Sequence, residues 1–321
     1  NGLIYTFITS GNPSILEPYS LMPFIFLFIV KARKSKNPVN YSMLAGIFLA
    51  FQIFSGGALI FIYTIVLIGA YIALDTIRAQ FWKNLAKTLI ILSVMSLIFF
   101  GVSAVKLLPG MDFIKKTNRA SGVSYQEYLG GDQFVFKDFF KAIVLNKASP
   151  GLKAHIGIIG FLLVLLSIGL WKKRMVFSLF LISAFILLLG SESFLAELFY
   201  KYFPTFAQTR HIGRVLFVFV FTSSVLAGYG FCYASAFATK KFRIIDRLKN
   251  IIFIAIVLLI LTELIFVKGL PTGLNITNQL KENQLAKYLG QQEDKFRITT
   301  FDVNDIVSFY GSSYYAQYGL E

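Results

Sequence analysis

The chain alternates long apolar stretches with short polar segments. Several apolar stretches run for 17 or more residues without a charged side chain. A helix of this length crosses a hydrocarbon core about 30 Å thick. The stretches are continuous rather than alternating, so they predict helices and not the short alternating strands of a membrane barrel. The pattern therefore predicts an all-α, polytopic membrane protein.

Hydropathy divides the apolar sequence into about eight transmembrane helices. The second is short, and only the SGG turn at 55–57 separates it from the third, so the two predict a tight helical hairpin. The predicted spans are 15–30, 41–54, 57–74, 88–108, 154–170, 175–190, 213–238 and 251–267.

Lysine and arginine gather in four short loops that contain few acidic residues. These loops fall at every second junction, so all four would lie on one side of the membrane. The positive-inside rule places that side in the cytoplasm. Asn1, the outer loops 109–153 and 191–212, and the C-terminal tail would then be extracytoplasmic. The basic loops are 31–36, 75–87, 171–174 and 239–249.

The tail differs from the rest of the chain. Segment 279–289 has amphipathic helical spacing, and KFRITTF at 295–301 alternates like a strand. We predict a transmembrane helical domain at 1–267 and the start of a small extracytoplasmic α/β domain at 268–321. The chain does not begin with Met and the α/β pattern stops early, so we expect an internal piece of a longer protein.

Composition agrees with a membrane protein and argues against other classes. Hydrophobic residues make up 56% of the chain and charged residues 15%, whereas a soluble domain carries about 25% charged residues. The net charge of +15 would suit nucleic acid, but the basic residues lie in loops between spans, where they orient the protein instead. The single cysteine, Cys232, lies in an apolar segment and is expected to be a small core residue.

Common enzymatic motifs are absent from the sequence. It contains no P-loop, HExxH or GxSxG pattern, and its two histidines offer no metal-ligand cluster. We therefore expect no metal site and no cofactor, while a bound divalent cation stays open.

Three charged residues fall inside predicted spans, near their outer ends. An ionisable group within the membrane is a functional candidate because its burial is costly. Glu17 is either an interfacial carboxylate near a helix start or a weak candidate for a catalytic base. Lys106 and Glu263 are expected to lie at the interface.

The stretch FPTFAQTRHIGRVLF places Arg210, His211 and Arg214 at the start of the seventh span. In a helix beginning near Thr209, the two arginines would lie one turn apart on one face. Cations oppose the helix dipole there, whereas an anion would gain from the dipole, the free N–H groups and the guanidiniums. We interpret the three residues as a candidate site for a lipid phosphate or pyrophosphate.

The alternative is that these cations bind ordinary lipid phosphates or pair with Glu192 and Glu197. Two further residues join the candidate set. Arg119 follows the end of the fourth span, and His155 opens the fifth. For His155, a purely interfacial histidine is the alternative.

Five phrases, in order, resemble the YfhO-type bacterial membrane proteins, a branch of the GT-C-like glycosyltransferases. They include an LLP followed by an arginine and a tyrosine, and a P-x-F-x-x-x-R-x-x-x-R signature followed by LAGYGF. The turn SGGAL departs from the family, which has Gly-His-Pro where this chain has Gly-Gly-Ala. The similar segments are 55–64, 105–125, 155–170, 203–231 and the tail phrases at 295–301 and 308–320.

The resemblance implies transfer of a sugar from a polyprenyl-phosphate carrier to an envelope polymer, such as teichoic acid, at the outer face of the bacterial cytoplasmic membrane. It implies an inverting displacement in which a carboxylate orients the acceptor. That acid is expected upstream of Asn1, so the catalytic residue is unassigned. Arg210 and Arg214 match the signature arginines and Arg119 the loop arginine. The implied partners are the polyprenyl-phosphate-linked sugar, the polymer acceptor and membrane lipids.

Two other functions stay open. A lipid-linked sugar flippase or transporter would show midplane charges or broken helices in matching halves, for which Gly56 and Gly57 are the one candidate break. A non-catalytic envelope-assembly protein would need only the outer domain and the basic loops.

Overall fold

The computed structural model describes residues 13–78, 81–117, 120–130, 133–144, 154–242, 251 and 254–263. Within these ranges the chain is mostly helical and has no strand, only an isolated bridge between Phe134 and Ser191. The predicted all-α character is therefore confirmed for the described part. Arg119 and the predicted α/β domain at 268–321 lie outside the described residues.

Ten helices carry α labels within the described ranges, joined by shorter helical turns. The long ones are α2 (Pro13–Lys34), α3 (Val39–Phe54), α4 (Ala58–Arg78), α5 (Phe81–Ile114), α7 (Ile158–Ser167), α8 (Arg174–Leu189) and α11 (Leu216–Phe242). The shorter ones are α6 (Tyr125–Leu129), η1 (Phe136–Asp138), η2 (Phe140–Val144), η3 (Ile168–Leu170), α9 (Phe194–Tyr202), α10 (Pro204–Ala207) and η4 (Ile212–Val215). A further helix, without a label, covers Ile254–Glu263.

Several helices are suited to a membrane by length and composition. Among the described residues, four are long and apolar enough to cross one, namely Ile15–Lys34, Ala58–Ile77, Leu85–Ile114 and Ile212–Phe237. They match the first, third, fourth and seventh predicted spans. The other predicted spans contain apolar helices of 10–17 residues. The chain therefore has the character of a multi-pass membrane protein.

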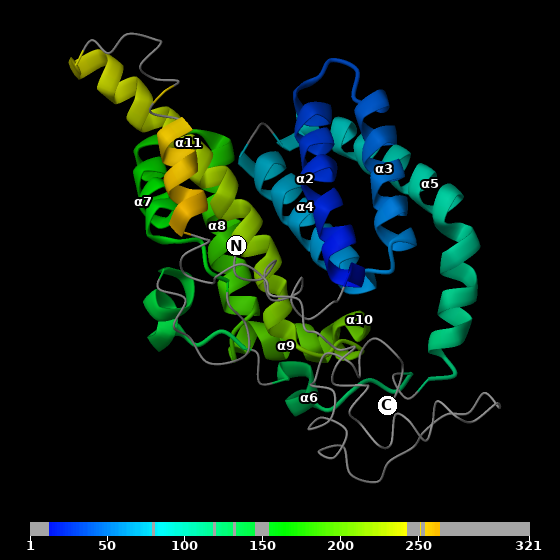
Figure 1. The fold of residues 1–321 in the computed structure, drawn as a ribbon. Coiled ribbons are helices and arrows are strands. Elements are labelled where there is room, and N and C mark those ends of the chain that lie inside the picture. Colours follow the sequence, from blue (N-terminus) through cyan, green and yellow to red (C-terminus); the bar gives the residue numbers. More distant parts are fainter. Residues whose placement is uncertain are drawn as a thin grey trace, which may run out of the picture.

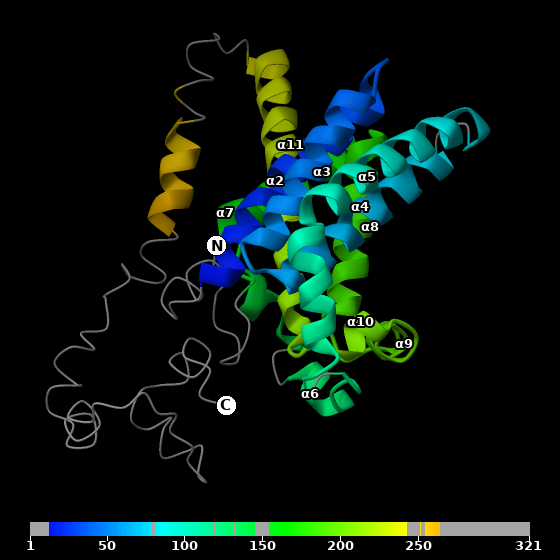
Figure 2. The ribbon, with the colours of Figure 1, turned by 90° about the vertical axis from the view of Figure 1, so that its right-hand side faces the viewer.

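The long helices lie side by side, and the connecting segments gather at two opposite ends (Figures 1 and 2). We call the end that carries α6, α9 and α10 the α6 end. The opposite end carries the α2–α3 connection and the C-terminal part of α11, and we call it the basic end. Lys34 ends α2 there, and Lys36 lies in the connection. Cys232 is exposed on α11, so the expectation that it is a core residue is wrong.

A buried ion pair joins three helices at the basic end. The side chain of Arg33 is 4% exposed, and its Nε donates a hydrogen bond to Asp75 Oδ2 at 2.6 Å. The Nη1 atom of Arg33 donates a second hydrogen bond, to Thr88 Oγ1, at 2.6 Å. Lys87 donates to the carbonyl oxygens of Arg33 and Ser35, both at 2.6 Å, and so caps the C-terminus of α2. The ends of α2 and α4 are thereby tied to the start of α5.

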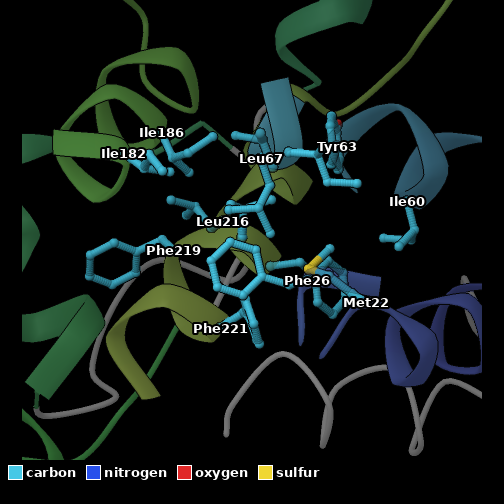
Figure 3. Packing of buried hydrophobic residues seen from close by; sticks show 14 of the residues in the cluster. Met22, Phe26, Ile60, Tyr63, Leu67, Ile182, Ile186, Leu216, Phe219 and Phe221 are labelled. Carbon is cyan, nitrogen blue, oxygen red and sulfur yellow. The ribbon is translucent and has the colours of Figure 1, made fainter. Parts of the chain in front are cut away.

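The apolar core lies where α2, α4, α8 and α11 meet. Leu67 and Leu216 are at most 1% exposed and pack among side chains from the neighbouring helices (Figure 3). The ring of Phe26 on α2 meets Phe221 on α11 edge-on, with centroids 5.4 Å apart. Such edge-to-face pairs are favourable beyond the area they bury.

Two glycines allow helices to approach closely. A Cβ at Gly230 of α11 would collide with the backbone of Leu163 in α7, and one at Gly46 of α3 would lie 2.6 Å from the carbonyl oxygen of Met95 in α5. Small residues at such crossings are the usual means of packing helices in membranes, where lipid is as apolar as the side chains.

Gly230→Ala is expected to separate α7 from α11 and lower the stability of the purified protein by about 1–3 kcal/mol, the usual cost of overpacking. The measurement is the thermal midpoint in detergent. Gly101→Ala is the matched control, because a Cβ at Gly101 meets nothing within 4 Å. Equal midpoints for the two variants would contradict the close α7–α11 packing.

Arg33→Ala is expected to destabilise the protein by about 3 kcal/mol, because it leaves the Asp75 carboxylate without its buried partner. The double variant Arg33→Met with Asp75→Leu should recover much of this loss, since no unpaired charge remains. Unfolding titrations in mixed detergent measure both. Lys34→Ala, at an exposed position in the same turn, should have little effect. A loss for Lys34→Ala as large as that for Arg33→Ala would contradict the role of the pair.

Candidate functional site

The segment that opens α11 differs from the predicted helix start. His211 is left-handed, with φ 64° and ψ 62°, and the helical structure begins with η4 at Ile212. Arg210 therefore precedes the helix, and the prediction that it shares a helical face with Arg214 is wrong. A left-handed residue between the two arginines turns the chain. Such strain in a non-glycine residue costs about 1–2 kcal/mol and persists only where the surroundings impose it.

Arg210 forms an ion pair with Glu127 of α6. The guanidinium lies 3.3 Å from Glu127 Oε1, and the two side chains are 41% and 49% exposed. Glu127 also completes a capping box with Ser124, which orients the carboxylate. The partner is thus Glu127 rather than Glu192 or Glu197. A pair this exposed contributes at most about 1 kcal/mol, so its main effect is to place Arg210 beside α6.

Gly130 ends α6 directly against His211. It has φ 66°, and a Cβ there would lie 2.5 Å from His211 Nδ1 and 3.0 Å from its Cα. Only glycine fits both this left-handed conformation and this contact. The end of α6 is therefore the surrounding structure against which His211 packs.

Arg214 lies on η4, in electrostatic interaction with Tyr63 of α4. Its charge acts on the hydroxyl of Tyr63, which lies on α4 about 8 Å along the axis from the helix start. The same hydroxyl interacts electrostatically with that of Tyr128 on α6. Both tyrosines are fully buried. Tyr63 on α4 thus interacts electrostatically with Tyr128 on α6 and with Arg214 on η4.

The tyrosines of the α6 end form a cluster. The ring of Tyr125 lies 5.9 Å from that of Tyr128, and both lie 5.2 Å from that of Tyr200 on α9. Burial raises the pKa of Tyr128 well above the usual range. Burial, and then the charges of Glu197 and Glu192, raise the pKa of Tyr125. Both phenols therefore stay protonated at physiological pH and act as hydrogen-bond donors.

Backbone hydrogen bonds join the two predicted outer loops into one layer. The N–H of Val123 donates to the carbonyl of Ala207 at 2.8 Å, and the N–H of Phe134 donates to that of Gly190 at 2.7 Å. The hydroxyl of Tyr200 donates to the carbonyl of Val123 at 2.8 Å. This layer positions α6 over the start of α11.

His155 belongs to a different place. Its ring is 1% exposed, and Nε2 lies 2.9 Å from the carbonyl oxygen of Val144, which can only accept. The prediction that it opens a helix is wrong, because α7 begins at Ile158. It lines an apolar cavity of about 280 Å³ with residues of α7, α11 and the helix Ile254–Glu263. On α11 this lining begins at Val220, about 9 Å along the axis from Arg214.

The other charged candidates lie at helix ends or reach one with their side chains. Glu17 is exposed in the first turns of α2. Lys106 donates to the carbonyl of Phe54 at 2.9 Å, at the C-terminus of α3. Glu263 accepts hydrogen bonds from the N–H groups of Ile158 at 2.6 Å and Ile159 at 3.4 Å. Glu263 and Lys106 thus satisfy backbone groups that helix termini leave without partners.

Sequence reasoning missed Tyr63 and Tyr128. In the sequence, Tyr63 is a tyrosine within a charge-free span and Tyr128 is a tyrosine in an outer loop. Neither position is specific enough to predict a site. No three His, Cys, Asp or Glu side chains in the described part of the chain lie close enough together to hold a metal ion.

Protein-family models, curated proteins and solved structures yield no match to this chain. The interpretation of the site therefore rests on its geometry. That geometry offers cations and phenolic donors at the start of α11, beside helices suited to a membrane.

Gly130→Ala is expected to push His211 out of position and to lower stability by about 1–2 kcal/mol, the cost of a left-handed alanine. The thermal midpoint in detergent measures the loss. Gly110→Ala is the control, because a Cβ there meets nothing within 4 Å. An unchanged midpoint for Gly130→Ala would show that α6 does not constrain His211.

Proposed function

We propose that the protein is a GT-C-like membrane glycosyltransferase with about eight spans, which takes a sugar from a polyprenyl-phosphate carrier at the α6 end. The acceptor is an envelope polymer on the outer face of a bacterial cytoplasmic membrane. The observation that carries the proposal is the position of Arg210, His211 and Arg214 together at the start of α11, against the end of α6.

The distribution of charge supports the proposed orientation. Lys34, Lys36 and the cations of 171–174 lie in or next to connections that the alternation of helices brings to the basic end. Cytoplasmic loops carry such an excess of lysine and arginine. The α6 end is then extracytoplasmic, where the layer formed by α6, α9 and α10 covers the helix ends.

The chemistry of the transfer explains the need for cations. The bond between the sugar and the phosphate oxygen breaks as the acceptor hydroxyl attacks the anomeric carbon, and a carboxylate takes the hydroxyl proton. Negative charge then grows on the departing lipid phosphate. A guanidinium held in place before the reaction stabilises that charge without reorganisation. Arg214 has this role in the proposal, with Arg210 and His211 beside it, and the carboxylate is not assigned to a described residue.

Arg214→Ala and Arg210→Ala should each lower sugar transfer by about 100-fold or more, because the leaving phosphate loses a cationic partner. Transfer is measured in proteoliposomes that contain polyprenyl-phosphate sugar and acceptor polymer. Lys201→Ala is the control, since Lys201 is an exposed cation on α9 in the same outer layer.

Full transfer by both arginine variants would exclude the phosphate role. A wild-type protein that moves the labelled donor across the bilayer without transferring its sugar would identify a flippase and exclude the transferase. Membrane insertion, followed by protease protection of the loops, should be the same for all variants.

A further inference from the structure

The cavity beside His155 has a wall made almost entirely of apolar residues. Its volume is about 280 Å³, and it lies between α7, α11 and the helix Ile254–Glu263, which is drawn in orange in Figure 1. Among its lining residues only His155, Ser223 and Ser224 are polar. An engineered apolar cavity of roughly 150 Å³ already binds benzene. The space is therefore large enough for a hydrophobic ligand.

The polar groups of this wall offer little to water or to a polar ligand. The hydroxyl of Ser224 donates to the carbonyl oxygen of Val220 in the same helix, at 2.8 Å. The Nε2 atom of His155 lies 2.9 Å from the carbonyl oxygen of Val144. A buried water needs about two to four polar partners. Because two of the three polar side chains are already engaged, the cavity favours an apolar ligand.

The cavity opens toward a surface that would face lipid. Gly228 and Val257 line the cavity and are also exposed, Val257 by 37%. On the same helices as the wall, large apolar side chains are about half exposed, namely Leu162, Leu258 and Leu259 at 53%, 56% and 55%. In a membrane, such a surface contacts hydrocarbon chains that are as apolar as leucine. A ligand can therefore enter the cavity from the bilayer.

The length of the cavity matches one leaflet of a bilayer. On α11 its lining runs from Val220 to Phe231, about 16 Å along the axis. Half of a hydrocarbon core measures about 15 Å. Phe231 precedes Lys240, the first charged residue of α11, by about 14 Å along the axis. The deep end of the cavity is therefore near the middle of the membrane, and the other end lies beside His155 and the start of α7.

We propose that the cavity binds one acyl chain of a membrane phospholipid from the leaflet at the α6 end. The glycerol end of the chain lies toward His155 and the methyl end toward Phe231. A straight chain that spans one leaflet fits both the length and the apolar wall. A polyprenyl chain is much longer and carries a methyl branch on every isoprene unit, so it would extend far beyond the cavity. The inference goes beyond the proposed function and does not depend on sugar transfer.

Gly228→Leu tests the proposal by filling the cavity. Gly228 lines the cavity, and a Cβ there meets nothing within 4 Å, so the leucine takes the place of the acyl chain. Leucine is also the better helix former. Gly101→Leu on α5 is the matched control, because a Cβ there also meets nothing within 4 Å and Gly101 is not a lining residue. Gly228→Ala is a smaller change that keeps the test available if the leucine variant does not fold.

Native mass spectrometry measures the phosphatidylcholine that the protein retains after release from nanodiscs into detergent. The wild-type protein and Gly101→Leu should each retain one phospholipid after the surface lipid has been removed. Gly228→Leu should lower the affinity about tenfold or more, which corresponds to lost contact with about two methylene groups. Gly228→Ala should have a smaller effect in the same direction. The thermal midpoint of Gly228→Leu in lipid-free detergent should be no lower than that of the wild type.

Phosphatidylcholine with a diazirine in one acyl chain tests the direction of the chain. A diazirine at the methyl end should label the wall near Phe231, and one close to the glycerol should label it near Val220. Gly228→Leu should remove both labels. Labelling of Leu97, a 74% exposed residue of α5 on the outside of the bundle, should persist in every variant.

A wild-type protein that retains no phospholipid would overturn the inference, and so would a folded Gly228→Leu variant that retains it as well as the wild type. Undecaprenyl phosphate that displaces the phospholipid at equal concentration would overturn the choice of an acyl chain and identify a polyprenyl chain as the occupant. Failure of the proposed function is a separate result. A protein that retains the phospholipid but transfers no sugar would keep the cavity site and remove the transferase.

Discussion

A charge buried among apolar helices has to be neutralised within the bundle, and much of this fold follows from how Arg33 meets that requirement. Its guanidinium bonds to Asp75 and Thr88, so α2, α4 and α5 are fixed to one another at the basic end. Because α4 is one continuous helix, fixing its last turns also constrains the direction in which its first turns run. Tyr63 lies in those first turns, about 20 Å along the helix axis from the ion pair. The site at one end thus depends on electrostatics at the other.

Much of the helical framework could be predicted from the sequence, because a charge-free run longer than a bilayer is thick leaves few alternatives to a helix. The ends were less predictable. The helix expected from Thr209 begins at Ile212, since contact with Gly130 at the end of α6 holds His211 in a left-handed conformation. A contact between Gly130 and His211, which lie far apart in the sequence, cannot be predicted from a local sequence pattern. The same limit applies to Arg210 and Glu127, which lie 83 positions apart.

The site itself could be predicted only in part. Cations beside an apolar run drew attention to Arg210, His211 and Arg214, and the structure places all three at the start of α11. Tyr63 and Tyr128 were not predicted, because a tyrosine in an apolar span looks like any interfacial aromatic residue until its hydroxyl is found buried. Two charges that appear costly within a span, Lys106 and Glu263, instead complete the hydrogen bonding of helix termini. Hydrogen bonds to the backbone therefore offset the cost of placing these two charges in the spans, and no ligand is required.

The bond between Glu263 and α7 has a mechanical consequence. The cavity beside His155 is bounded by α7 and α11 on one side and by the helix Ile254–Glu263 on the other, through Ile256 and Ile260. That helix cannot move away from α7 without taking the carboxylate from the N–H groups of Ile158 and Ile159. Widening the cavity therefore also frays the first turn of α7. The volume of the cavity and the hydrogen bonding of that first turn are therefore coupled.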